Sequence, residues 1–247
     1  MTLEIMEADV KHSRLLIFAL LLLFLGGARE LMAYEGGSVS NGGTIEGVVK
    51  FKGTAPSPKK IQVSKDTNVC GKTAKTDESL VVNNGDIEYA VVSIEKIDKG
   101  KPMTPTVVKL DQKDCDYHPH VLAFPAGSTI EVINPDGILH NIHSYSKVNS
   151  PFNYAQPKFK KTLSVKIDKP EVINVKCDVH NWMNGWLFSA ANPYFSVTDE
   201  HGSFKLGDVP AGTYTLTVWQ EKLGRSTKKV TVKAGQDSKV DFELAAK

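Results

Sequence analysis

Hydrophobic and polar residues alternate along much of the chain after residue 34, and no window there sustains the period of a helix. Such alternation places every second side chain on one face of a strand, and residues 129–133 are a clear case. Turn signals such as residues 134–137, Asn-Pro-Asp-Gly, separate these stretches. We therefore predict an all-β fold of antiparallel sandwiches or barrels. Further strands are expected around residues 45–51, 81–82, 90–94, 163–167, 172–177, 213–218 and 240–244.

The first 33 residues have a different pattern. Lys11, His12 and Arg14 precede an unbroken apolar run, Leu15 to Leu25, which is followed by small residues. This order is typical of a secretory signal peptide, and the run is shorter than the ~20 residues that a membrane span needs. We predict cleavage after Ala33, with an uncleaved anchor as the alternative. The mature chain would then be exported, periplasmic or at the cell surface, with no membrane span and in an oxidising compartment.

Composition narrows the classes of function. The 247 residues are 41% hydrophobic, which is enough for one domain or for two small ones. Thirty basic and 28 acidic residues give a net charge of +2, so nothing favours nucleic acid or an anionic membrane as a partner. No nucleophile motif, phosphate-binding glycine loop or Ser/His/Asp constellation is present, so we do not predict an enzyme. Five lysines are interpreted as solvated strand faces and edge protection rather than a docking patch: Lys158, Lys160, Lys161, Lys166 and Lys169.

Residues suited to bind a metal are concentrated in two short segments. The first, residues 134–143, contains two histidines, and the second is Cys177-Asp-Val-His180-Asn-Trp-Met183. Spacing of three places the thiolate, imidazole and thioether of the second segment on one tight turn after a strand. These soft ligands select copper over hard cations. A blue-copper site needs one more imidazole, which the first segment supplies.

The second segment resembles the ligand loop of the cupredoxins, and its spacing is most similar to that of amicyanin. The stretch from Asn134 to Ile142 is similar to the cupredoxin segment that delivers the first histidine. The resemblance covers residues 79–190 and implies a Greek-key β-sandwich that binds one copper ion. It also implies that Asn141 ties the two ligand segments together. The implied ligands are His140, Cys177, His180 and Met183.

One feature departs from that family, and three further histidines need an interpretation. Amicyanin-like loops carry prolines beside the second histidine, where this loop has Val179 and Asn181. On an extended strand His143 would face away from His140, so we interpret His143 as an ordinary strand residue. We interpret His118 and His120 as surface or strand-end residues, with a second metal site as the alternative.

The chain has three cysteines, an odd number, so at least one is unpaired, bound to metal or paired between molecules. With Cys177 as a copper ligand, the remaining Cys70 and Cys115 are free to pair in an oxidising compartment. We therefore predict a Cys70–Cys115 disulfide. Covalent haem is not expected, because the chain has no Cys-x-x-Cys-His run.

The C-terminal part carries a second resemblance. Residues 195–206 and 209–218 resemble the second half of a carboxypeptidase regulatory-like domain, a small transthyretin-like β-sandwich. Residues 43–49, Gly-Thr-Ile-Glu-Gly-Val-Val, resemble its first strand. This implies a sandwich split by an inserted cupredoxin, and the alternative is one cupredoxin with β-extensions at both ends. The expected divisions are a signal peptide at 1–33, the first part of the sandwich at 34–78, the cupredoxin at 79–190 and the rest of the sandwich at 191–247.

Three functions are compatible with these features. The first is an exported electron carrier that serves a redox partner protein. His180 and Trp182 would provide its electron exit and docking surface, whereas Trp186 is expected to pack in the core. The second is copper storage, delivery or sensing with the same ligands. The third is an extracellular structural or interaction module, in which the transthyretin-like part does the work.

Overall fold

The computed structural model describes residues 34–246, and these residues confirm the all-β prediction. Two helical turns interrupt the strands, the α-helix α2 at Thr67–Cys70 and a 3₁₀ turn at Lys113–Cys115. No helix in the described part of the chain is long and apolar enough to cross a membrane. The predicted signal peptide at residues 1–33 lies outside the described residues.

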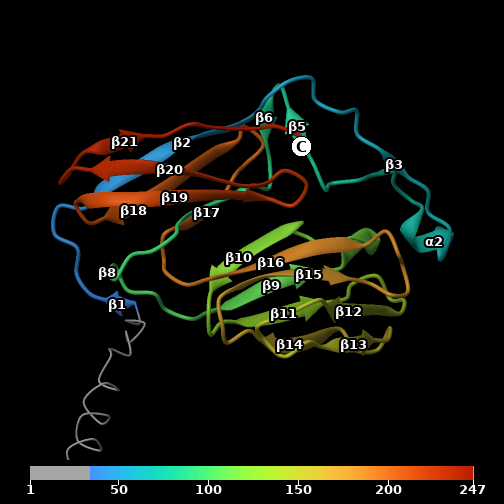
Figure 1. Cartoon of the computed structure of the whole chain (residues 1–247). Coiled ribbons are helices and arrows are strands. Elements are labelled where there is room, and N and C mark those ends of the chain that lie inside the picture. Colours follow the sequence, from blue (N-terminus) through green and yellow to red (C-terminus); the bar gives the residue numbers. More distant parts are fainter. Residues whose placement is uncertain (1–33, 247) are drawn as a thin grey trace, which may run out of the picture. The chain divides into compact units, whose positions relative to one another are not determined.

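Strands from the middle of the chain form two sheets that enclose one core (Figure 1, green to orange). Leu163 and Val165 point into this core while their neighbours are exposed, as the alternation predicted. The five-stranded sheet has the order β10 (Val121–Pro125), β16 (Asn184–Ala190), β15 (Glu171–Lys176), β12 (His140–Ser144), β13 (Asn153–Gln156). The three-stranded sheet has the order β14 (Thr162–Lys166), β11 (Thr129–Ile133), β9 (Val107–Asp111).

A second pair of sheets combines strands from both ends of the described chain around another core. In Figure 1 the blue strand β2 lies among the orange and red C-terminal strands. One sheet contains β18 (Ser203–Val209), β2 (Gly43–Phe51), β6 (Asp86–Ile87) and β5 (Val82–Asn83), with β21 (Asp237–Lys239) and β22 (Phe242–Leu244) also on β2. The other sheet contains β17 (Phe195–Val197), β7 (Val91–Ile94), β19 (Gly212–Gln220) and β20 (Gly224–Val232).

The two glycines of the β2 motif have a steric role. A Cβ at Gly47 would lie 2.0 Å from the carbonyl oxygen of Val240, and one at Gly43 would lie 2.6 Å from that of Gln236. Only glycine allows so close an approach of two backbones. The motif therefore lets the C-terminal segment lie along β2.

Strand pairing bears on where the two parts of the chain divide. β7, which falls inside the expected cupredoxin range of 79–190, pairs with β17 and β19 instead of with the central strands. Because β7 pairs outside that range, we propose that the inserted part begins after β7 and ends with β16, with the transthyretin-like strands on either side of it in sequence. Two short pairs lie outside these sheets: β1 (Glu35–Gly36) with β8 (Lys99–Gly100), and β3 (Lys60–Ile61) with β4 (Lys75–Thr76).

Candidate metal centre

The two segments singled out in the sequence meet at one end of the five-stranded sheet. His140 is the first residue of β12, and Cys177 directly follows β15. The hairpin from β15 to β16 turns within residues 177–183, where the Cys177 N–H donates to the Met183 carbonyl (3.3 Å) and the Met183 N–H to the His180 carbonyl (2.9 Å). These bonds fold the loop into the tight turn that the spacing predicted.

Three potential ligand atoms converge at this turn. Nδ1 of His140 lies 3.0 Å from Nδ1 of His180, and the sulfur of Cys177 lies 4.0 Å and 3.8 Å from these two nitrogens. All three side chains are buried, and all three atoms lie within 4.8 Å of one another. A single metal ion could therefore contact all of them.

Each histidine is held by a carboxylate on the opposite edge of its ring. Nε2 of His140 lies 2.9 Å from Asp136, and Nε2 of His180 lies 2.8 Å from Asp66. A carboxylate accepts hydrogen bonds, so we assign the proton of each ring to Nε2. Nδ1 of each ring faces Cys177. It can donate to the thiolate when the ring is charged, or bind a metal that displaces this proton.

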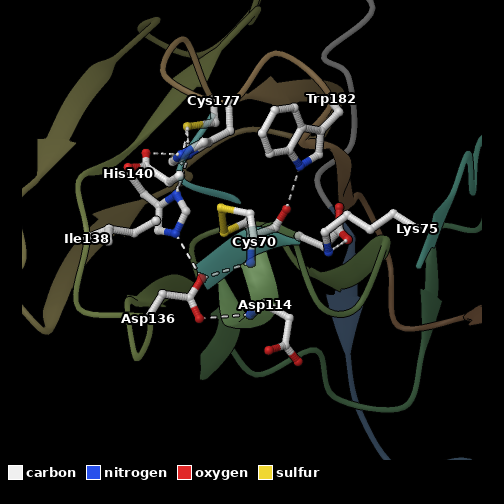
Figure 2. Close-up of a disulfide and its surroundings, with 12 residues drawn as sticks. Cys70, Lys75, Asp114, Asp136, Ile138, His140, Cys177 and Trp182 are labelled. Atoms are coloured by element: carbon white, nitrogen blue, oxygen red, sulfur yellow. Dashed lines mark hydrogen bonds and ion pairs between the residues drawn. A yellow bond between two sulfur atoms is a disulfide. The ribbon is translucent and has the colours of Figure 1, made fainter. Parts of the chain in front are cut away.

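Asp136 is itself fixed by the backbone. Its two carboxylate oxygens accept hydrogen bonds of 2.8 Å from the N–H groups of Asp114 and Cys115. The bond to Asp114 can be followed in Figure 2. Burial alone would raise the pKa of Asp136, but its hydrogen bonds with His140 and with these N–H groups lower it overall. The carboxylate thus stays ionised and keeps the ring of His140 in one orientation.

The surroundings of Cys177 favour its thiolate form. Burial would raise its pKa, but contacts with His140 and His180 and with backbone N–H groups outweigh this and lower the pKa to about 6. For His140, burial lowers the pKa, and Asp136 and Cys177 raise it overall. Because the thiolate is the form of cysteine that binds metals, Cys177 is prepared for a metal at neutral pH.

Asn141 joins the segments that contain His140 and Cys177. Its side-chain oxygen accepts a 2.7 Å hydrogen bond from the backbone N–H of Asp178. Its amide nitrogen donates to Asn153 (2.7 Å) and to the carboxylate of Asp178 (3.1 Å). Met183 is fully buried in the same core cluster as Cys177.

The Cys70–Cys115 disulfide is confirmed, and Cys177 is left free. We call residues 62–71, between β3 and β4, the strap. The disulfide ties the strap to the 3₁₀ turn that carries Cys115, close to His140 (Figure 2). Val63 and Val69 of the strap pack against the same core.

Other candidate residues have different surroundings from those of the three donors. His143 is partly exposed, lies 3.1 Å from Asp178 and stacks on Tyr145. His120 contacts the carboxylate of Glu221. Neither His118, His120 nor His143 belongs to a donor group within residues 34–246. A second such group, Cys115 with Asp136 and His140, has its sulfur in the disulfide and so lacks a thiolate.

The expected electron exit through His180 needs correction. The ring of His180 is 0% exposed, because Asp66 covers the edge that was expected to face solvent. Trp182 is half-buried, packs against His180 with ring centroids 5.2 Å apart, and donates its N–H to the Cys115 carbonyl (3.1 Å). Trp186 packs edge-on against Trp219, in keeping with the packing role expected of it.

Sequence reasoning did not identify the two carboxylates as site residues. Asp136 was noticed only as part of a turn signal, although its spacing of four from His140 was available. Asp66 is 114 residues from His180 and has no local pattern that marks it. Only the fold brings Asp66 to the site.

Comparison with solved structures finds copper proteins among the matches. One match is a Cu-containing nitrite reductase from Thermus scotoductus SA-01, which is 19% identical with a TM-score of 0.33. This match covers 39% of this chain but only 25% of that reductase. A single-residue mutant of amicyanin, in the Cu(I) state, is 18% identical over 34% of this chain and 82% of its own, with a TM-score of 0.31. A purple cupredoxin from Nitrosopumilus maritimus is 20% identical over 34% of this chain and 99% of its own, with a TM-score of 0.30.

Comparison with protein-family models finds a match for the C-terminal part of the chain. No curated protein matches the chain. Residues 189–245 match the model of the carboxypeptidase regulatory-like domain, which confirms the resemblance noted for residues 195–218.

Proposed function

We propose that the protein is an exported mononuclear copper protein that carries single electrons to or from a redox partner protein. The supporting observation is the buried convergence of Nδ1 of His140, Nδ1 of His180 and the sulfur of Cys177. Two imidazoles and one thiolate with a weak axial thioether form the blue-copper ligand set, and Met183 is the thioether of this proposal. Bound copper would supply one-electron chemistry by alternating between Cu(I) and Cu(II).

The side chains around the site suit electron transfer because they set the donor positions in advance. Asp136 and Asp66 orient the two imidazoles, and Asn141 fixes the Cys177 loop against β12. Burial of the donors excludes water and other exogenous ligands. A site held this firmly from outside changes little in shape between oxidation states, and an electron carrier needs this property.

Storage, delivery or sensing of copper is the second candidate, because the same donors would serve it. It requires ready exchange of the ion, which the burial of all three donors opposes. A purely structural role is the third candidate, and it leaves the lowered pKa of Cys177 without a use. The disulfide is in keeping with export to an oxidising compartment.

The test is a titration of the purified protein with Cu(II), followed by visible absorption and electron paramagnetic resonance. We expect one equivalent of copper, an intense blue band and a narrow copper hyperfine splitting, which together report a thiolate bonded to Cu(II). A colourless protein that takes up Cu(I) would favour storage or delivery. Failure to bind either ion would favour the structural candidate.

Two variants sharpen this test. Cys177→Ala should lose the blue band, and a variant that stays blue would show that Cys177 is not the ligand. His143→Ala is the matched control, because His143 is a nearby histidine outside the donor group. It should keep the blue band and the stoichiometry of one ion.

A further inference from the structure

The strap brings a carboxylate to the edge of a proposed copper ligand from a distant part of the chain. Nε2 of His180 lies 2.8 Å from Oδ2 of Asp66, and this ring is completely buried while the Asp66 side chain is 37% exposed. The carboxylate therefore stands between the imidazole and solvent. Nothing in the copper-ligand pattern itself requires a residue at this place.

We propose that Asp66 is a positioning residue of the metal site. It fixes the Nε2–H tautomer of His180 and covers the ring, and its negative charge favours Cu(II) over Cu(I). This inference rests on the proposed function in its copper-dependent part only. The effect on the tautomer and on the exposure of His180 holds in the metal-free protein.

The strap is anchored firmly enough to place Asp66. The carbonyl oxygen of Asp66 accepts hydrogen bonds of 2.9 Å from the N–H groups of Val69 and Cys70, which close the turn of α2. Cys70 is bonded to Cys115, and Val69 packs against the core. Asp66 has a positive φ of 48°, a conformation that aspartate tolerates better than most residues. The carboxylate is thus held by backbone, disulfide and packing together.

Cys115 connects the supports of the two histidines. Its N–H donates to Asp136, which holds His140, and its sulfur is bonded to Cys70 in the strap that carries Asp66. Its carbonyl oxygen accepts the indole N–H of Trp182, the labelled ring in Figure 2. Trp182 in turn packs on His180. The orientation of both imidazoles therefore depends on one residue outside the ligand set.

The test compares Asp66→Ala and Asp66→Asn with the wild type. The Ala variant removes both the hydrogen-bond acceptor and the charge, whereas the Asn variant keeps an acceptor oxygen and removes only the charge. Asp168→Asn is the matched control, because Asp168 is an exposed aspartate just after the end of β14. The last residue of β14 pairs with Thr129, the first residue of β11. A dispersed amide NMR spectrum verifies that each variant is folded.

The first readout is NMR of the histidine rings in the metal-free protein. We expect a slowly exchanging Nε2 proton on His180 in the wild type, in Asp168→Asn and in Asp66→Asn. In Asp66→Ala we expect exchange at least tenfold faster. Unchanged tautomer and exchange in Asp66→Ala would overturn the positioning role. If that variant does not fold, the wild type decides the positioning role, because a neutral His180 ring with its proton on Nδ1 instead of Nε2 would overturn it. An unchanged potential in folded Asp66→Asn would overturn the electrostatic part.

The second readout is the reduction potential of the copper-loaded protein. At a fixed potential, loss of the Asp66 charge should raise the ratio of Cu(I) to Cu(II) about tenfold in both variants. A shift no larger than that of Asp168→Asn would overturn the electrostatic part. If the wild type binds no copper, the proposed function fails, and the ring spectra still decide whether Asp66 positions His180.

Discussion

The side-chain oxygen of Asn141 lies 2.7 Å from the backbone nitrogen of Asp178, so the residue after the first histidine holds the residue after the cysteine. The two proposed ligand segments are otherwise separate in sequence, because these partners are 37 positions apart. The hydrogen bond fixes the distance between β12 and the loop that follows β15. It therefore links local structure in two strands to the geometry of one site.

Replacement of Asn141 should loosen this link. Asn141→Ala leaves the Asp178 N–H without its partner, which should destabilise the protein by about 1–3 kcal/mol. It should also broaden or shift the blue absorption band, because the freed N–H belongs to Asp178, the residue next to Cys177. Urea unfolding and visible spectra measure the two effects. Asn153→Ala removes a partner of the Asn141 amide nitrogen and a hydrogen bond to the Asp178 carboxylate, but it leaves the Asp178 N–H bonded to Asn141, so the band should stay in place.

The disulfide offers a second test of how the site is supported. Replacing Cys70 and Cys115 together with Ala removes a cross-link between residues 45 apart in sequence, which should cost about 3–4 kcal/mol of stability in the chain-entropy model. Urea unfolding measures this loss. The double variant should still bind copper through Cys177, but a chelator should remove the ion faster because the strap is freed. Equal chelation rates in both proteins would contradict a covering role of the strap.

The local parts of the structure were predictable from the sequence. Alternation in residues 129–133 and 163–167 predicted strands whose alternate residues are buried, and the structure confirms this. The compact spacing of Cys177, His180 and Met183 likewise predicted a single tight turn, because all the residues involved are close together in sequence. Ligand chemistry pointed to the segment 134–143 for one more imidazole, the family resemblance favoured His140 within it, and His140 lies next to this turn in the fold.

The long-range parts were not predictable. The apolar residues of Val91–Ile94 identify a strand but do not specify its partner, so its pairing with β17 and β19 was missed. Asp66 lies in a polar stretch with no periodicity, and its place beside His180 depends on the whole path of the strap. The exposure of His180 was misjudged for the same reason, since a covering residue can come from anywhere in the chain.

Met183 can be tested through two substitutions that separate packing from ligation. Met183→Ala should cost about 2–5 kcal/mol, because the side chain is fully buried and a cavity would remain. Met183→Leu nearly conserves volume and should cost less than about 1.5 kcal/mol. Both variants should keep copper and change its potential, since axial thioethers bind weakly. An unchanged potential in Met183→Leu, measured by redox titration, would remove Met183 from the ligand set.

Glu171, the first residue of β15, fixes the loop of residues 146–149 by accepting several hydrogen bonds. Its carboxylate bonds to the Ser146 hydroxyl (2.6 Å) and to the N–H groups of Lys147 (2.5 Å), Val148 (3.0 Å) and Asn149 (3.0 Å). Burial alone would raise the pKa of Glu171, but these bonds outweigh it and lower the pKa to about 2. A depressed carboxyl pKa means that the ionised form stabilises the fold.

The stabilisation by Glu171 should therefore depend on pH with a definite sign. An unfolded glutamate has a pKa of about 4.3, so the full effect is present above that pH and is lost as the pH falls toward about 2. We expect Glu171→Ala to lower stability by about 1–2 kcal/mol at pH 7, after allowance for solvent screening of a partly exposed group. The gap between wild type and variant should close between about pH 4.3 and pH 2, as measured by urea unfolding across that range. Because Glu171 begins β15 and Cys177 follows its other end, the copper spectrum should stay unchanged. A gap that persists at pH 2 would mean that Glu171 stabilises the loop by packing rather than by its charge.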